Sequence, residues 1–292
     1  MKEQVYNHIP LYNTLKRKIE ENSPLHHVAY GEPFDDYYHD LYNDLFYKNF
    51  VFKNNLSNGY FVEIGALDGV INSQSFIFEK HLKWDGIVVE PNPIWHEDFE
   101  IYRSCNKSKC AVSNNNDGAL FECREIPSFS GLKSTTNEIR ISDIKNEISV
   151  ETITLIDLLD KYNAPSIIDW ISIDTEGAEL DILEHFFYNN KKYQINLINF
   201  ECNNDTQEYL KITKLLETQP YLKIKNPYLD LLRMSIENGL VKFQPITGEF
   251  HKSLYLDFPI KNIDNLLEIN FEHFYVHIDF LKTNLHLKKL LI

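Results

Sequence analysis

The feature that most constrains the fold is an apolar run that breaks into a glycine-bearing turn, residues 60–69 with the sequence YFVEIGALDG. The run has the length of a strand, and the helix-forming residues 76–80 follow the turn that contains Gly65 and Gly69. A second buried-looking strand, residues 87–90, ends in the carboxylate of Glu90. A strand, a glycine turn, a helix and then a strand ending in an acid about 20 residues later is the order of a nucleotide-binding βαβ unit. The pattern predicts an α/β fold.

Composition and charge limit the class of protein. The 292 residues carry a net charge of −14, which disfavours sequence-independent binding to phosphate backbones, so we expect no nucleic-acid partner. The four cysteines show no CxxC spacing and are expected to be reduced thiols. The residues after Met1 are polar, and no apolar run reaches the length of about 18 residues that a membrane span needs. We therefore expect a soluble cytoplasmic protein.

Apolar runs and turn residues predict the remaining elements. The expected third strand, residues 109–112, is followed by a turn and by residues 119–124, which should pair back on it as a hairpin. Later strands are predicted at residues 150–154, 167–174, 194–201, 221–225 and 253–256, and helices at 93–104, 155–162, 178–187, 206–217 and, as one or two amphipathic helices, 266–291.

No repeat or linker divides the chain, so a single compact unit is expected. We expect an N-terminal helical cap over residues 1–53, a core over 54–256 and a C-terminal helical extension over 257–292. The extension could mediate homo-oligomer contacts or acceptor recognition. Residues 35–53 are rich in aromatic and acidic side chains, and Tyr38 is a candidate contact of a substrate pocket there. The alternative for this helix is core packing with a solvated acidic face.

Acidic residues recur at or near the ends of the predicted strands. They are Glu63, Glu90, Asp174 and Glu201, with Asp68 in the first turn. Ligands of open α/β sheets bind outside the carboxyl ends of the strands. A single acid at such a position would as readily cap a helix or pair with a lysine, but several around a glycine turn indicate a ligand site.

The turn itself discriminates between nucleotides. It lacks the third glycine of a pyrophosphate-binding turn, and the carboxylates of Glu63 and Asp68 would repel a diphosphate. S-adenosylmethionine, which carries a sulfonium and an ammonium group, suits an acidic turn better. The residues therefore favour a methyl donor over a nicotinamide cofactor. A nicotinamide-dependent oxidoreductase and a methyltransferase-like binding or assembly protein without turnover are the alternatives.

Several motifs resemble, in order, those of the FkbM family of class I methyltransferases. The two specific ones are FVEIGALDG at 61–69 and WISIDTEGAE at 170–179, and the weaker ones lie at 72–73, 89–93, 111–113, 154–159 and 200–201. The resemblance implies a Rossmann-like, mostly parallel seven-stranded sheet flanked by helices. It also implies S-adenosylmethionine as donor and, as acceptor, a hydroxyl group on a sugar, a glycan or a related small molecule.

The resemblance also implies roles for individual residues. Glu63, Gly65 and Asp68 would border the methionine end of the donor, Glu90 and Asn92 the ribose, Ser113 the adenine edge, and Asp174 the transferring methyl group. Ser73 belongs to the matched block after the turn and is counted among the cofactor-binding candidates. Glu176, in the turn after Asp174, and Glu201, at the next strand end, are candidate substrate contacts.

The expected reaction is in-line attack of an acceptor hydroxyl on the sulfonium methyl. Asp174 is the first candidate for the general base, and His251, whose imidazole titrates near neutral pH, is the second. In a metal-dependent alternative, Asp174, Glu201 and His251 would surround Mg²⁺. His273 and His277 have a spacing that can ligate zinc on a helix, but the neighbouring apolar residues favour a packed amphipathic helix, and no metal site is predicted there.

Overall fold

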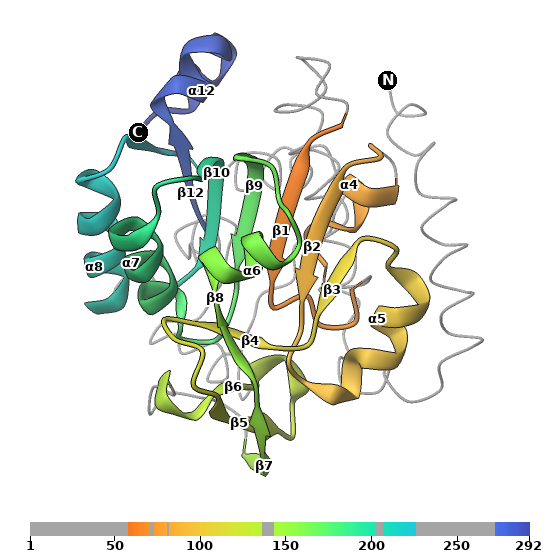
Figure 1. The fold of residues 1–292 in the computed structure, drawn as a ribbon. Helices are drawn as coiled ribbons and strands as arrows, with labels where there is room; N and C mark the ends of the chain where they lie inside the picture. The colour runs from red at the N-terminus through yellow and green to blue at the C-terminus, as the bar shows by residue number, and fades with distance from the viewer. Residues whose placement is uncertain (1–57, 70–72, 81, 136–142, 203–206, 226–271) are drawn as a thin grey trace, which may run out of the picture. The chain divides into compact units, whose positions relative to one another are not determined.

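The computed structural model describes residues 58–69, 73–80, 82–135, 143–202, 207–225 and 272–292. The chain divides into two units, residues 1–38 and 39–292, and all described residues belong to the second. Their main element is a seven-stranded sheet with the strand order β11-β12-β10-β9-β1-β2-β3 (Figure 1). These strands are β1 Tyr60–Ile64, β2 Asp85–Val89, β3 Asn106–Ser108, β9 Ile167–Ile173, β10 Gln194–Glu201, β11 Tyr221–Ile224 and β12 Glu272–His277.

The sheet is mostly parallel. The neighbouring strands β3, β2, β1, β9 and β10 run parallel to one another, whereas β12 is antiparallel to both β10 and β11. The chain builds outward from β1 to β3 and then returns to place β9 on the other side of β1. This reversal of strand order is the topological switch point, and ligands of open α/β sheets bind beside it, at the carboxyl ends of the strands.

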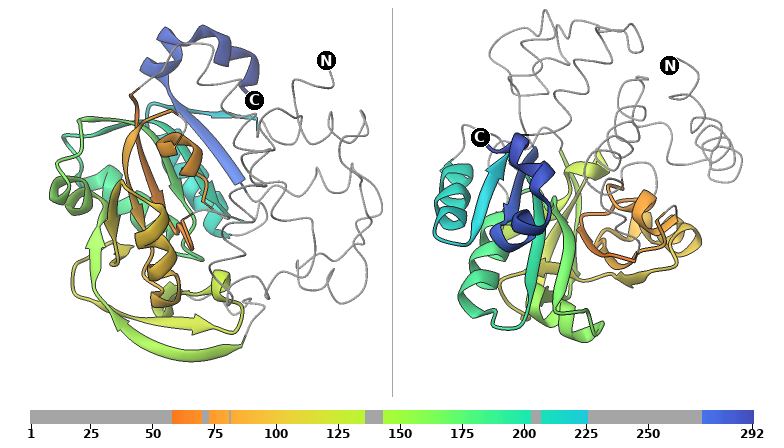
Figure 2. Two further views of the ribbon diagram at one scale, coloured as in Figure 1. Left: turned by 90° about the vertical axis from the view of Figure 1, so that its right-hand side faces the viewer. Right: turned by 90° about the horizontal axis from the view of Figure 1, so that it is seen from above.

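Helices cover both faces of the sheet (Figure 2), because the residues on each strand alternate between two apolar layers. One layer contains side chains of α6 Leu155–Lys161, α7 Glu179–Asn189 and α8 Gln207–Glu217, and the other contains side chains of α4 Phe76–Lys80, α5 His96–Tyr102 and α12 Ile278–Thr283. Residues that pair across β1, β9 and β10 lie in the same layer. Val62, Ile171 and Ile198 belong to the first layer, and Phe61, Trp170 and Leu197 belong to the second.

The prediction of a third sheet strand at residues 109–112 is wrong. The third strand is β3, whose Asn-Lys-Ser sequence has no apolar pattern because it lies at the edge of the sheet. The apolar residues that follow form β4 Ala111–Ser113, which pairs with β8 Thr152–Thr154 instead of joining the main sheet.

The predicted hairpin partner is also wrong. Residues 119–124 do form a strand, β5 Ala119–Arg124, but its partners are β6 Gly131–Leu132 and β7 Ile144–Val150. These three strands make a separate sheet. The partner of β5 lies beyond an irregular polar segment, and pairing over such a distance leaves no local signal in the sequence.

The prediction of helices over residues 266–291, and with it of a helical extension over 257–292, is wrong for residues 272–277. They form β12, in the interior of the main sheet, before the short α12 and the 3₁₀ helix η5 Leu285–Leu290. His273, Tyr275 and His277 alternate along β12 with Phe274 and Val276, and all five are buried. A strand that is buried on both faces lacks the apolar–polar alternation of a half-buried strand. Sequence periodicity alone therefore does not distinguish it from a buried helix.

The predicted strand at 253–256, the helix over 35–53 and the boundaries at residues 53 and 256 lie outside the described residues, and these boundaries stay predictions. Over the ranges that are described, no helix has the length and apolarity needed to cross a membrane.

Candidate functional site

The turn after β1 is attached to both neighbouring strands. Gly65 has a φ of 89°, and a Cβ atom at this position would overlap the backbone carbonyl oxygen of Asp174 at the end of β9. The Asp174 backbone N–H donates to the carbonyl oxygen of Ile64 at 2.9 Å, and the N–H groups of Gly65 and Ala66 both donate to Val89 at 3.0 Å. Glycine is therefore required where three strand ends converge.

Glu90 follows β2 and holds this turn from the other side. Its carboxylate accepts hydrogen bonds from the backbone N–H of Leu67 at 2.9 Å and of Asn92 at 2.7 Å, and the side chain is 3% exposed. Burial raises the pKa of Glu90 to about 8, and the nearby carboxylates of Asp68 and Glu63 act in the same direction, against the two hydrogen bonds. A ligand that donates hydrogen bonds to this carboxylate would favour its ionised form.

Asn92 links the Glu90 corner to the three-stranded sheet. Its side-chain oxygen accepts from the backbone N–H of Ile94 at 3.3 Å and caps the 3₁₀ helix η2 Pro93–Trp95. Its amide nitrogen donates to the Ser130 hydroxyl at 3.3 Å. The same hydroxyl accepts from the Arg124 backbone N–H at 3.0 Å. Ser113 is buried at the end of β4, where it pairs with Thr154.

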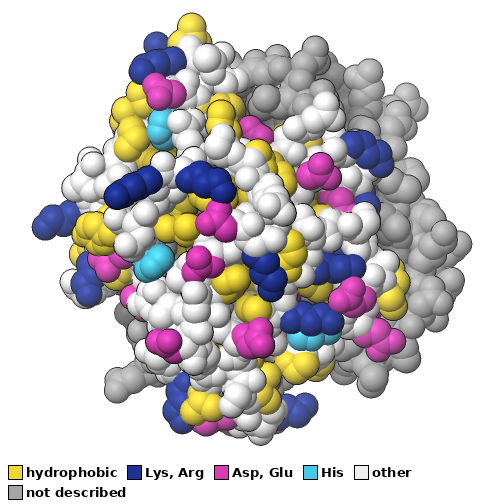
Figure 3. Space-filling model, viewed as in Figure 1, with side chains coloured by type: hydrophobic (Ala, Val, Ile, Leu, Met, Phe, Trp, Pro, Cys, Tyr) yellow, Lys and Arg dark blue, Asp and Glu magenta, His cyan; other side chains and the backbone are white. Residues whose placement is uncertain are grey.

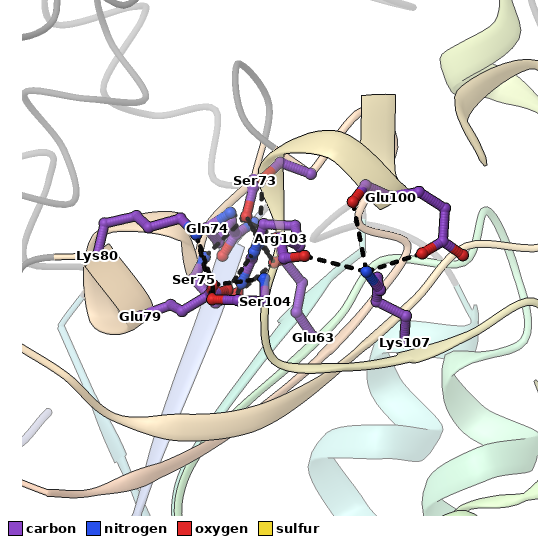
Figure 4. A network of polar contacts seen from close by, with 11 residues as sticks. Glu63, Ser73, Gln74, Ser75, Glu79, Lys80, Glu100, Arg103, Ser104 and Lys107 are labelled. Atoms are coloured by element: carbon purple, nitrogen blue, oxygen red, sulfur yellow. Dashed lines mark hydrogen bonds and ion pairs between the residues drawn. The ribbon is translucent and has the colours of Figure 1, made fainter. Parts of the chain in front are cut away.

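Glu63 faces the start of α4. Its oxygens accept hydrogen bonds from the hydroxyls of Ser73 and Ser75 and from the backbone N–H of Gln74, at 2.5–2.7 Å (Figure 4). Arg103 Nη1 lies 3.5 Å from the same carboxylate. The structure therefore places Glu63 and Ser73 together, in a network that fixes the chain after the turn, and direct contact of either with a donor stays a prediction.

Gln74 extends this network across the sheet. Its side-chain oxygen accepts from the Ser172 hydroxyl at 3.0 Å and from the Asn199 amide at 2.6 Å. Ser172 lies between Glu63 and Asn199 in the strand register, so the three side chains form one polar row across β1, β9 and β10. The row lies near the carboxyl ends of β1, β9 and β10.

Two acidic side chains meet at the ends of β9 and β10. Asp174 and Glu201 follow the paired residues Ile173 and Phe200, and their carboxyl groups form a hydrogen bond with each other. Burial raises the pKa of Glu201, the Asp174 hydrogen bond opposes this shift, and the charge of Glu179 adds to it. A hydrogen bond between two carboxyl groups requires a proton on one of them.

The turn after β9 is shaped by Glu179, at the start of α7. Its carboxylate accepts from the backbone N–H and hydroxyl of Thr175 and from the Gly177 N–H, at 2.6–2.9 Å. Glu176 is half-buried in this turn with a φ of 61°, which is uncommon for a residue other than glycine. The structure thus brings Glu176 into the turn that leads away from Asp174.

Sequence reasoning did not identify Gln74, Arg103 or Glu179 as parts of the site. Glu179 had a local signal, because an acid in the first turn of a helix commonly binds N–H groups before it. Arg103 had none, since its partners are 24 to 40 positions away in the chain. His251 and Tyr38 lie outside the described residues and stay predictions. Within the described ranges, no group of three or more His, Cys, Asp and Glu side chains is placed to hold a metal ion.

The surface in Figure 3 carries acidic and basic side chains of the described residues side by side. The net charge of −14 is therefore not gathered into a single acidic patch on this face.

Comparison with known proteins gives a family match. Residues 63–223, more than half of the chain, match the family model of the methyltransferase FkbM domain. The chain is also similar to the crystal structure of a methyltransferase FkbM from Methylobacillus flagellatus KT, with 13% identity and a TM-score of 0.35 over 62% of this chain and 44% of that one.

Two further structures are similar at the same low level. A precorrin-6y C5,15-methyltransferase from Geobacter metallireducens GS-15 has 14% identity and a TM-score of 0.32 over 57% of this chain and 65% of that one. The METTL16 MTase domain has 11% identity and a TM-score of 0.37 over 64% of this chain and 59% of that one. The matches span less than two thirds of the length of these three structures. No curated protein matches the chain.

Proposed function

The chain belongs to the methyltransferase FkbM family, and from this premise we propose that it is an S-adenosylmethionine-dependent O-methyltransferase acting on a hydroxyl of a sugar, a glycan or a related small molecule. The observation that carries the proposal is the junction of three strand ends at Gly65. Its turn is packed against Asp174 and bonded to β2, and Leu67 of the same turn is bonded to Glu90. The candidate groups for the two ends of the donor and for the acceptor would thereby belong to one site.

The residues of this site fit such a donor. Glu90 is a buried carboxylate with a raised pKa, so two ribose hydroxyls that donate to it would offset the cost of its ionisation. Gly65 and Asp68 would border the cationic methionine end, since Asp68 is a nearly buried acid in the same turn. Asn92 and Ser113 would border the ribose and adenine. Bound S-adenosylmethionine would supply the electrophilic methyl group.

The acceptor would bind beside the Asp174–Glu201 pair. Burial, the largest influence on the pKa of Glu201, raises it against the opposing hydrogen bond with Asp174, so we propose that the proton between the two carboxyl groups lies on Glu201 and that Asp174 is ionised. Asp174 would then accept the proton of the acceptor hydroxyl. Glu176, in the turn after Asp174, would contact the acceptor, and His251 is the second candidate for the base. The fixed geometry of the strand ends would contribute more to the rate than the base does.

Calorimetric titration with S-adenosylmethionine and S-adenosylhomocysteine tests the donor. Incubation with donor labelled in its methyl group and a panel of sugars, glycans and hydroxylated small molecules tests the acceptor. We expect donor binding and labelled product, with binding retained and product lost in Asp174→Asn. Failure of both ligands to bind at millimolar concentration would remove the enzyme proposal, and binding of S-adenosylmethionine without transfer to any acceptor would favour a protein without turnover.

We also propose that the reaction takes place in the cytoplasm. All four cysteines are described, and all four are free thiols, as expected in a reducing compartment. Fractionation of the native host with reporters of known compartments tests this placement.

A further inference from the structure

A buried arginine lies behind the donor turn and is not used by the proposed reaction. The side chain of Arg103, which directly follows α5, has no exposed surface. Its guanidinium lies 5.6 Å from the ring centroid of Phe61 and 5.8 Å from that of Phe76. A buried charge is costly unless it is paired and hydrogen-bonded, so the partners of Arg103 indicate its role.

The guanidinium joins the end of the turn to the start of α4. Nη1 donates to the carbonyl oxygen of Gly69 at 3.0 Å and to the Ser73 hydroxyl at 2.8 Å, and Nη2 donates to the Ser75 hydroxyl at 2.8 Å (Figure 4). Gly69 has a φ of 74°, and a Cβ atom there would lie 3.0 Å from Arg103 Cγ. A side chain at position 69 would therefore need a left-handed backbone and a shift of Arg103 or Phe99.

The third donor of the guanidinium points to a different carboxylate. Nε donates to Glu79 at 2.6 Å, and Glu79 also accepts from Lys80 at 2.7 Å and from the backbone N–H of Ser104 at 2.7 Å. Burial opposes ionisation of Glu79, but Arg103 and the hydrogen bonds hold its pKa well below its usual range. With Glu63, the network contains two cations and two anions, so its charges balance.

We propose that Arg103 is a positioning residue of the donor site, which fixes the turn through Gly69 and the start of α4 through Ser73 and Ser75, and that Glu79 orients Arg103 for this task. The inference rests on the proposed function and deepens it. Glu90 holds the same turn at Leu67, so the turn is fixed from two sides, with Asp68 between the two attachments. Loss of the attachment by Arg103 should weaken binding of the methionine end of the donor more than binding of the adenosine end.

Lysine cannot replace this side chain. An ammonium group keeps the charge but lacks the planar fork that binds Gly69, Ser75 and Glu79 simultaneously. Arg103→Lys should therefore behave like Glu79→Gln, which leaves the turn untouched and removes only the carboxylate that orients Nε.

The test compares two ligands in both variants. S-adenosylhomocysteine reaches the methionine end, whereas adenosine carries only the base and ribose. We expect Arg103→Lys and Glu79→Gln each to weaken S-adenosylhomocysteine binding about tenfold or more, and adenosine binding by less than about twofold. Each variant loses a hydrogen bond to a charged group at the Arg103 attachment of the turn, whereas the Glu90 attachment is unchanged. In the double variant the two losses should not add, since both act through the same guanidinium.

A destabilised control separates positioning from general loss of structure. Leu216→Ala removes a fully buried side chain of α8 on the opposite face of the sheet, and it should change the two affinities by the same factor. If Arg103→Lys does not fold, Ser75→Ala, which removes the hydroxyl that accepts from Nη2 and donates to Glu63, carries the same expectation. Equal weakening of both ligands, or no weakening, in Glu79→Gln and Ser75→Ala would overturn the inference. Failure of wild-type protein to bind S-adenosylhomocysteine would instead overturn the proposed function together with it.

Discussion

Gly65 and Asp174 are 109 residues apart in the chain, yet the Cα of Gly65 lies so close to the Asp174 backbone carbonyl that no side chain fits between them. The contact joins the first strand to the strand that carries the candidate base. It fixes the backbone of the residue that carries the candidate base relative to the donor turn.

Gly65→Ala should therefore abolish donor binding and destabilise the protein by more than about 3 kcal/mol, because left-handed strain and a steric overlap add. Denaturant unfolding and calorimetric titration measure the two effects. Gly118→Ala is the matched control, since Gly118 has a similar φ of 78° but its added Cβ would lie 3.3 Å from the Val150 carbonyl oxygen. That variant should lose only about 1–2 kcal/mol, the cost of the left-handed conformation, and should bind donor normally.

Substitution of each member of the carboxyl pair should give opposite results. Glu201→Gln keeps a hydrogen-bond donor toward Asp174 and should retain turnover within about tenfold, whereas Asp174→Asn removes the base and should lower kcat by about 10²–10⁴. Both measurements use saturating donor. If Glu201→Gln were the inactive variant and Asp174→Asn the active one, the proton would belong to Asp174 and the two roles would be exchanged.

The core of the site could be predicted from sequence because its signals are local. Glu90 and Asp174 directly follow apolar runs of strand length, Glu63 lies one residue before the end of the first run, and Gly65 breaks that run, so position along the chain is enough to place them at the carboxyl ends of the strands. What each of these residues binds depends on contacts made across the fold. The sequence therefore supports their roles toward a ligand as proposals.

The errors have a common physical cause. β3 is polar because it is an edge strand, and β12 is buried on both faces because it is an interior strand, so neither shows the alternation that identifies a half-buried strand. Arg103 likewise has no local sequence signal, because only the folded chain brings its guanidinium to Gly69 and Glu79.

The affinity for adenosine should rise with pH through about pH 8. Burial holds the pKa of Glu90 near this value, and its ionised form is the better acceptor of the ribose hydroxyls. Titrations at a series of pH values test the expectation, with adenosine as the ligand because it carries no amino acid group that titrates in the same range. Glu90→Gln should bind adenosine more weakly and with no such rise, and an unchanged pH profile in this variant would exclude Glu90 as the ribose acceptor.

Acid sensitivity of the fold should depend on His273. This side chain is fully buried on β12, its Nε2 lies 2.8 Å from the Cys202 carbonyl oxygen, and burial lowers its pKa to about 4. A histidine with a depressed pKa binds fewer protons when folded than when unfolded, so its contribution is present above about pH 6.5 and is lost as the pH falls toward 4. The shift corresponds to about 3 kcal/mol at most.

Buried acids such as Glu90 act in the opposite direction, because a raised pKa stabilises the fold at low pH, and the difference between wild type and His273→Gln isolates the histidine. Urea unfolding at several pH values should show that the variant is less stable than wild type near neutral pH and that this deficit shrinks toward pH 4. Tyr275→Phe, on the same strand, loses a hydroxyl bound to Thr213 and no group that titrates in this range, so its deficit should stay constant. A His273→Gln deficit that is equally constant would show that the ring contributes packing alone, between Tyr209 and Phe200, with no protonation linked to unfolding.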